Sequence, residues 1–265
     1  MNEMEVQLSY LMTNKAKVLS LEESFEALIN FDVIFVGEIH DSCFAHEAEF
    51  TLLTGLSQRD PNLVLALEMF ERDVQDILDA YLMGSISEDQ FLEKSRPWPN
   101  YQEDYRPLIE LAKTRGIPVI AANVPRRAAA AVARANRISP KVIGEDRLFL
   151  PKKVHLDSKA YHERFLASVV EMPRHTPMKG MNVNGLYKAQ VLKDAVMAAS
   201  LEPFLDRLIL FCCGHFHSDY RQGIPYQLQK DHPELKTAVI TFSSSLEELP
   251  MKNRSQVADF IWLES

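Results

Sequence analysis

The stretch Phe31-Asp-Val-Ile-Phe-Val-Gly-Glu-Ile-His-Asp41 decides the fold. Its first six residues form a β-branched and aromatic run that stops at Gly37, which is typical of a buried strand. The sequence Ser20-Leu-Glu-Glu23 just before it is a capping box, which predicts a short helix to about Asn30. After the strand, Asp41 or Ser42 is a candidate N-cap for a helix over residues 43–57.

Five more apolar runs recur along the chain, at residues 63–67, 117–121, 208–212, 237–242 and 260–262, with helical patterns between them. Near-continuous apolar runs predict strands that are covered on both faces. We therefore expect an α/β fold with a mostly parallel β-sheet flanked by helices. Residues 141–200 contain helical patterns near 157–171 and 182–200 but no strand pattern, so they predict a helical insertion.

Length and charge limit the class of protein. The chain has 265 residues, and 29 Lys and Arg against 37 Asp and Glu give a net charge of −8. This length and an ordinary soluble composition predict one domain over residues 1–265. Because no basic cluster is longer than a pair, nucleic acid is not an expected partner.

The cysteines and the N-terminal residues indicate the cellular compartment in which the protein is expected. Cys212 and Cys213 are adjacent in a strand pattern and Cys43 stands alone, so no disulfide framework fits. Residues 1–14 lack a basic and then apolar leader pattern, and no stretch approaches the roughly 20 apolar residues of a membrane span. We expect a reducing, cytoplasmic setting without an integral membrane segment.

Polar residues follow several of the predicted strands, where ligands of open α/β sheets bind. They are Glu38, His40, Glu68, His215 and His217. Singly, each has an ordinary explanation, such as a solvated loop pair or a structural histidine. Together they form a nitrogen and oxygen ligand set that suits Zn²⁺, Mn²⁺ or Fe, and a metal held there could activate water.

Two further features suggest a ligand. Pro125 as the first helical residue would place Arg126 and Arg127 in the first helical turn, where positive charge opposes the helix dipole. An anion such as a carboxylate would relieve this conflict. Equally, the arginines could simply be exposed. Tyr187, Gln190 and Asp194 lie on one side of a predicted helix. This polar stripe either faces solvent or contacts a polar partner.

The sequence contains no GxxxxGK[ST], GxSxG, HExxH or GxGxxG motif after a strand, so the P-loop, serine hydrolase, zincin and dinucleotide classes lose their main support. Five blocks do resemble a known family in their order. They are Val36-Gly-Glu-Ile-His-Asp41, Leu67-Glu-Met-Phe70, Tyr105-Arg-Pro-Leu108 with Ile117-Pro-Val-Ile-Ala-Ala-Asn123, Gln190 with Asp194-Ala-Val-Met-Ala198, and Cys213-Gly-His-Phe-His217. Together they resemble the ChaN family of haem-binding proteins.

The resemblance implies haem as the cofactor, a homodimer, and tyrosine or histidine as iron ligand. The candidates in the insertion are Tyr161, His162, His175 and Tyr187, and Arg126 and Arg127 would hold the propionates. This chain lacks the lipobox of the lipoprotein members.

The same resemblance extends to a superfamily with TIKI/TraB-like metalloproteases and erythromycin esterases. It implies catalytic roles for Glu38, His40, Glu68 and His217. Our leading hypothesis is a haem- or tetrapyrrole-binding protein in iron or haem handling. The alternative is a metal-dependent hydrolase of an ester or amide that uses the Glu and His cluster.

Overall fold

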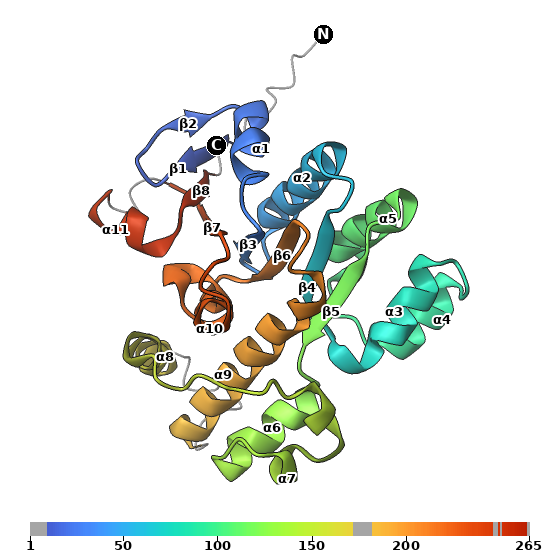
Figure 1. Cartoon of the computed structure of the whole chain (residues 1–265), viewed down its shortest axis with the longest axis vertical. Helices are drawn as coiled ribbons and strands as arrows, with labels where there is room; N and C mark the ends of the chain where they lie inside the picture. Colours follow the sequence, from blue (N-terminus) through green and yellow to red (C-terminus); the bar gives the residue numbers. More distant parts are fainter. Residues whose placement is uncertain (1–9, 172–181, 246–248, 250, 264–265) are drawn as a thin grey trace.

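The fold is built on one sheet in the part of the chain that the computed structural model describes, residues 10–171, 182–245, 249 and 251–263. The strand order is β2-β1-β8-β7-β3-β6-β4-β5 (Figure 1). The strands are β1 (Tyr10–Thr13), β2 (Val18–Leu19), β3 (Val33–Glu38), β4 (Val64–Glu71), β5 (Val119–Asn123), β6 (Ile209–Gly214), β7 (Thr237–Ser243) and β8 (Phe260–Leu263).

The pairs from β8 to β5 are parallel, and β1 is antiparallel to both β2 and β8. The predicted class, a mostly parallel sheet flanked by helices, is therefore confirmed. All six predicted strands are present, and β1 and β2 were not predicted.

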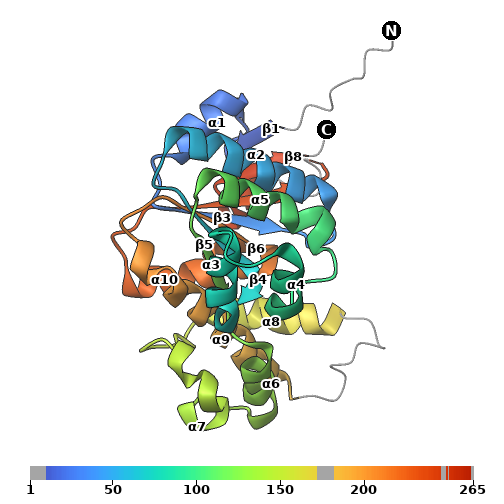
Figure 2. The same ribbon diagram turned by 90° about the vertical axis from the view of Figure 1, so that its right-hand side faces the viewer.

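Helices cover both faces of the sheet (Figure 2). One face, which includes Ile34 and Val36, packs against α1 (Leu21–Leu28), α2 (Cys43–Arg59), α3 (Gln75–Leu82), α4 (Glu88–Ser95) and α5 (Arg106–Arg115). The other face, which includes Val33 and Phe35, packs against α9 (Val183–Ser200), α10 (Ile224–Asp231) and α11 (Met251–Val257). Adjacent residues of β3 face opposite layers because side chains alternate along a strand. This explains why the strand sequences are apolar without interruption.

Local signals place the helix starts. The capping box at Ser20 forms as predicted, and Ser42 caps α2 by accepting a hydrogen bond from the Ala45 amide. Pro125 differs from the prediction: it is the extended N-cap of α6 (Arg126–Ala135) and not its first helical residue. Arg126 is therefore the first residue of that helix.

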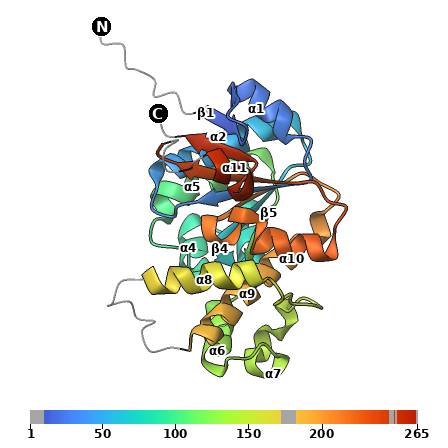
Figure 3. The same cartoon turned by 90° about the vertical axis from the view of Figure 1, so that its left-hand side faces the viewer.

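The predicted insertion holds α7 (Pro140–Ile143), α8 (Lys159–Glu171) and α9. One end of α9 packs against α6 on one side and against α8 on another (Figures 1 and 3). Its other end packs on the sheet through Met197 and Ala198. At Gly185, an added Cβ would lie 2.1 Å from the Ala133 carbonyl oxygen, so α6 and α9 touch backbone to backbone. Thus α9 attaches the insertion to the core.

Within the described ranges, no helix combines the length and apolar character needed to cross a membrane.

Candidate functional site

Three neighbouring strands, β3, β6 and β4, bring their polar carboxyl ends together. Glu38, the last residue of β3, is the register partner of Gly214 at the end of β6. Glu68 lies in β4, whose pairing with β5 becomes irregular between Leu67 and Glu71. We call this edge the rim. The strand continues past Glu68 to Glu71, further than predicted, but the irregular pairing leaves Glu68 facing β6.

The first rim group centres on Glu38, which is buried. Its Oε1 accepts a hydrogen bond of 2.5 Å from the Tyr105 hydroxyl and lies 2.6 Å from His40 Nδ1. The His40 ring packs edge-on against Trp98, with 4.6 Å between ring centroids. Burial lowers the pKa of His40, but the bond to Glu38 and the charges of Glu68 and Glu38 more than offset this, so the pKa is raised. Glu38 therefore holds the His40 ring through its Nδ1 atom.

The second rim group is a buried chain from Glu68 through His217 to Asp194. His217 Nε2 lies 3.2 Å from Glu68 Oε1, and Nδ1 lies 2.5 Å from Asp194 Oδ1. Tyr161 donates to the other Asp194 oxygen at 2.7 Å. Burial opposes both charges, but mutual attraction prevails: the pKa of Glu68 falls to about 2 and that of His217 rises to about 9. At neutral pH Glu68 and His217 therefore form a buried ion pair. Gln190 also faces this ring, so the predicted polar stripe of α9 has a partner.

The two groups meet at Gly214. Its amide donates to Glu68 Oε2 at 2.9 Å, and an added Cβ would lie 2.8 Å from both Cε1 and Nε2 of the His40 ring. Gly37 is equally restricted, because its Cβ would lie 2.6 Å from the Ser218 hydroxyl. Gly37 and Gly214 therefore allow the two Gly-x-x-His segments, residues 37–40 and 214–217, to approach each other closely.

The structure brings four of the five predicted rim residues together. His215 departs from them: its side chain is half exposed and its Nδ1 lies 3.1 Å from Asp219 Oδ2. Within the described ranges, the group whose ligand atoms all lie within 4.8 Å of one another is instead Glu38, His46 and Glu49.

Sequence reasoning missed His46 and Glu49 on α2. His46 Nδ1 lies 3.0 Å from Glu49 Oε2 and 3.4 Å from Glu38 Oε2. Burial and the charge of Glu38 hold the pKa of Glu49 well above its ordinary value. Burial opposes the charge of His46, but the bond to Glu49 and the Glu49 and Glu38 charges raise its pKa to about 9. A signal existed: His46 and Glu49 are three residues apart on the stripe that continues with Leu53 and Leu56, so both face the core.

The predicted arginine pair does not face the haem candidates. Arg127 forms ion pairs with Asp73 at 2.8 Å and with Asp146 at 2.5 Å, so its charge at the start of α6 is balanced without a bound anion. Arg126 is exposed. Because α6 and α8 contact different sides of α9, the structure does not bring these arginines together with Tyr161, His162 and Tyr187 (Figure 1).

The haem candidates differ in how free their side chains are. Tyr161 is buried and its hydroxyl binds Asp194, which leaves it poorly placed to reach an iron. Tyr187 is also buried, and its hydroxyl lies 3.4 Å from the Ser158 carbonyl oxygen. The His162 ring packs on Tyr187 at 4.4 Å, and its Nε2 has no hydrogen-bond partner among the described residues. His175 lies outside the described residues.

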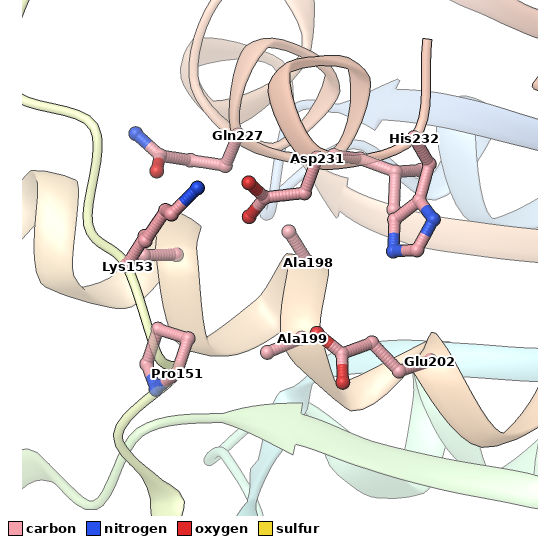
Figure 4. Close-up of a pocket in the computed structure, with 10 residues that line it drawn as sticks. Pro151, Lys153, Ala198, Ala199, Glu202, Gln227, Asp231 and His232 are labelled. Carbon is pink, nitrogen blue, oxygen red and sulfur yellow. The ribbon is translucent and has the colours of Figure 1, made fainter. Parts of the chain in front are cut away.

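Hollows in the described surface vary in size. An open hollow of about 480 Å³ lies beside α2 and is lined in part by His46, Glu47 and Asp104. Another of about 310 Å³ lies between α3 and the end of α5. A third, where Lys153 approaches α9 and α10, measures about 10 Å³ and has room for about one water molecule (Figure 4).

Comparison with known proteins agrees with this fold. A model of the family described as haem-binding uptake, Tiki superfamily, ChaN matches residues 25–228. ChaN of Campylobacter jejuni, whose structure shows cofacial haem binding, is similar with a TM-score of 0.74 and 19% identity over 97% of both chains.

A curated relative is Protein RETICULATA-RELATED 5, chloroplastic, of Arabidopsis thaliana, with 22% identity over 90% of this chain. The chain spans about a third of that relative, 35% of its length. The family match covers most of the present chain, and its Gly-Glu-Ile-His and Gly-His-Phe-His segments meet at the rim. The chain therefore belongs to the family of haem-binding uptake proteins in the Tiki superfamily that includes ChaN.

Proposed function

We propose that this chain binds haem, or a closely related tetrapyrrole, on the outer surface of α8 and serves in iron or haem handling. The observation that carries the proposal is the family match over residues 25–228. Haem supplies redox and ligand chemistry at its iron, and the protein contributes an axial ligand and an apolar surface.

The surface of α8 supports this location. His162, Leu166 and Val170 are four residues apart and form one stripe along the helix. Leu166 is 38% exposed and Val170 is 84% exposed, so the stripe offers apolar surface for a flat ring. His162 Nε2 is buried and has no hydrogen-bond partner in the described part of the chain, so a rotation of the side chain would present a free ring nitrogen to the haem. We therefore assign the iron ligand to His162 in preference to Tyr161, whose hydroxyl is already engaged.

A haem titration followed by absorbance tests this proposal. We expect saturation near one haem per chain, and His162→Ala should weaken binding by more than about 10-fold and shift the Soret band. Tyr161→Phe should leave the band unchanged, and His215→Ala is the matched control for loss of a histidine elsewhere. An unaltered spectrum and affinity in His162→Ala would remove His162 as ligand, and a changed band in Tyr187→Phe alone would transfer the role to that tyrosine.

We also propose that the protein works in a reducing compartment, with the cytoplasm as the first expectation. All three cysteines are free, and two of them are buried. Microscopy of the tagged full-length protein in its own organism tests this, and signal in an oxidising compartment would contradict it.

A second candidate function, hydrolysis of an ester or amide, is supported by the geometry of His40. Glu38 binds His40 Nδ1, so the opposite ring nitrogen is directed toward Gly214, and the side chain is 42% exposed. A carboxylate that orients a histidine in this way favours general-base chemistry on water. A metal bound by Glu38, His40, Glu68 or His217 would supply a Lewis acid there.

Hydrolysis is tested by screening chromogenic esters and peptides. We expect Glu38→Gln and His217→Ala to lower turnover by more than about 100-fold while the proteins stay folded. His215→Ala, which alters a histidine outside both rim groups, should keep its activity. Equal turnover in the wild type and both variants would remove these residues from any mechanism.

A further inference from the structure

A cluster of buried polar side chains, which we call the pocket, lies between α2 and the end of β3. It is formed by Glu38, His46 and Glu49, whose exposed fractions are 2%, 4% and 0%. Burial of two carboxylates and an imidazole is costly unless each is paired or holds a metal. The pocket is distinct from the Glu68–His217–Asp194 chain, which lies on the α9 side of the sheet.

The orientation of His46 shows which ring nitrogen faces the carboxylates. Its Nε2 lies 3.0 Å from the His40 carbonyl oxygen and 3.7 Å from Asp104 Oδ2, and both are acceptors. Nε2 must therefore carry a hydrogen. A cation would displace the proton from Nδ1, which frees a lone pair directed at Glu49 and Glu38. A backbone carbonyl that orients a histidine through its distal N–H is a recurrent feature of metal ligands.

The carboxylates leave acceptor atoms without partners. Glu38 Oε2 and Glu49 Oε1 are buried and have no hydrogen-bond partner among the described residues. Glu38 uses its other oxygen for Tyr105 and His40. Several acceptor lone pairs therefore lie close together in the pocket. Their mutual repulsion is relieved only if the side chains share protons or bind a cation.

The spacing of the donors fits a cation. The His46 Nδ1 atom lies 3.0 Å from Glu49 Oε2 and 3.4 Å from Glu38 Oε2. Two ligands at about 2.0–2.1 Å from a tetrahedral zinc ion lie about 3.3 Å apart. We propose that Glu38, His46 and Glu49 bind a divalent transition-metal ion, with Zn²⁺ as the best match to one nitrogen and two oxygen donors. Three protein ligands leave a fourth position for water.

An open hollow borders His46 on the α2 side. His46 lines the open hollow of about 480 Å³ together with Glu47, Glu103 and Asp104. Acidic side chains around an opening attract cations from solution. An ion could therefore reach the pocket through the His46 side without passing the rim.

The test is zinc binding by the full chain, stripped with a chelator and then titrated with Zn²⁺ against a chromophoric zinc indicator. We expect one tight site per chain in the wild type and a thermal shift on zinc addition. Glu49→Gln keeps the side-chain shape but removes a charged ligand, so it should weaken zinc binding by more than about 10-fold. His46→Gln provides a second variant if Glu49→Gln does not fold.

Controls separate the pocket from other zinc binding. Glu93→Gln removes a charge at an exposed position of α4, outside the lining of the hollow, and should bind zinc as the wild type does. His217→Gln tests the rim, and His162→Ala tests the haem surface, on which this inference does not depend. Absence of zinc uptake by the stripped wild type would leave a shared proton as the occupant and overturn the inference. Wild-type affinity in Glu49→Gln, or loss of zinc in His217→Gln alone, would overturn it as well.

Discussion

Glu68 and His217 are both buried, and each is charged because the other is. A buried ion pair gains little over an apolar pair, but removing one partner leaves an uncompensated charge. The second His217 nitrogen is tied to Asp194, so the ring cannot turn without breaking two contacts. The pair thereby fixes both the position and the protonation of His217.

This pair makes stability depend on pH. The pKa of His217 is raised from 6.5 to about 9, so its contribution is complete below pH 6.5 and is lost as pH rises through 9. The pKa of Glu68 is lowered from 4.5 to about 2, so its contribution is complete above pH 4.5 and is lost as pH falls through 2. We predict that the free energy of unfolding in urea falls between pH 6 and about 9.5, with a contribution from His217 on the order of 3 kcal/mol.

The control for this prediction is His217→Gln, which should lose its share of the pH dependence above pH 6. His46 titrates in the same window, because its pKa is also raised to about 9, so part of the dependence should remain. Identical pH profiles in wild type and His217→Gln would contradict the assignment.

Some site residues could be predicted and others could not. Glu38, Glu68 and His217 follow apolar runs, and parallel strands place their carboxyl ends at one edge, so their proximity was predictable. Tyr105 and His46 reach Glu38 from helical segments. The direction in which a helical side chain points toward the sheet depends on how the whole helix packs. The residues around Tyr105 and His46 do not determine that packing, so their contacts with Glu38 could not be predicted.

Among the elements, α1 and α2 are held together by a contact at Gly55. An added Cβ there would lie 2.1 Å from Phe25 Cζ, and Arg59 covers the same ring at 4.6 Å from its centroid. The absence of a side chain at Gly55 thus makes room for the Phe25 ring. This contact explains a glycine in the middle of a helix, where glycine otherwise disfavours helix formation.

We predict that Gly55→Ala lowers the free energy of unfolding by about 1–3 kcal/mol, because the clash with Phe25 outweighs the gain of about 1 kcal/mol in helix propensity. Urea denaturation measures the change. Gln58→Ala, at an exposed position of α2, should stay within about 0.5 kcal/mol of wild type. A more stable Gly55→Ala protein would show that the ring moves aside freely.

At this scale the sequence predicted the six mutually parallel strands, the capped helix α1 and the helix α2 that follows β3. It did not predict β1 and β2, because β2 has two residues and β1 depends on antiparallel pairing with β8. Such short antiparallel strands are set by distant partners, whereas the parallel strands carry their own apolar signal.

In the whole molecule, the α8 stripe faces outward, and a haem bound there would have one covered face. A flat ring has two faces, so the second would remain exposed unless another copy covered it. We predict that the apo chain sediments as a monomer and the haem-loaded chain as a dimer. Sedimentation velocity tests this when the apo chain is followed by its aromatic absorbance and the loaded chain at the Soret wavelength. Val170→Glu should weaken this association, since it places a charge on the stripe. A haem-loaded monomer would contradict the model.

The pairing of β1 with β8 has a consequence for biosynthesis. Tyr10 is the register partner of Leu263, so β1 docks on a strand that the ribosome makes much later. During translation, β1 and β2 have no neighbour on one side, and β7 has an unpaired edge. Exposed edges of this kind invite association with other chains. The nascent protein therefore passes through a stage in which early capture by a chaperone, or slow release of β8, determines how much of it reaches the native state.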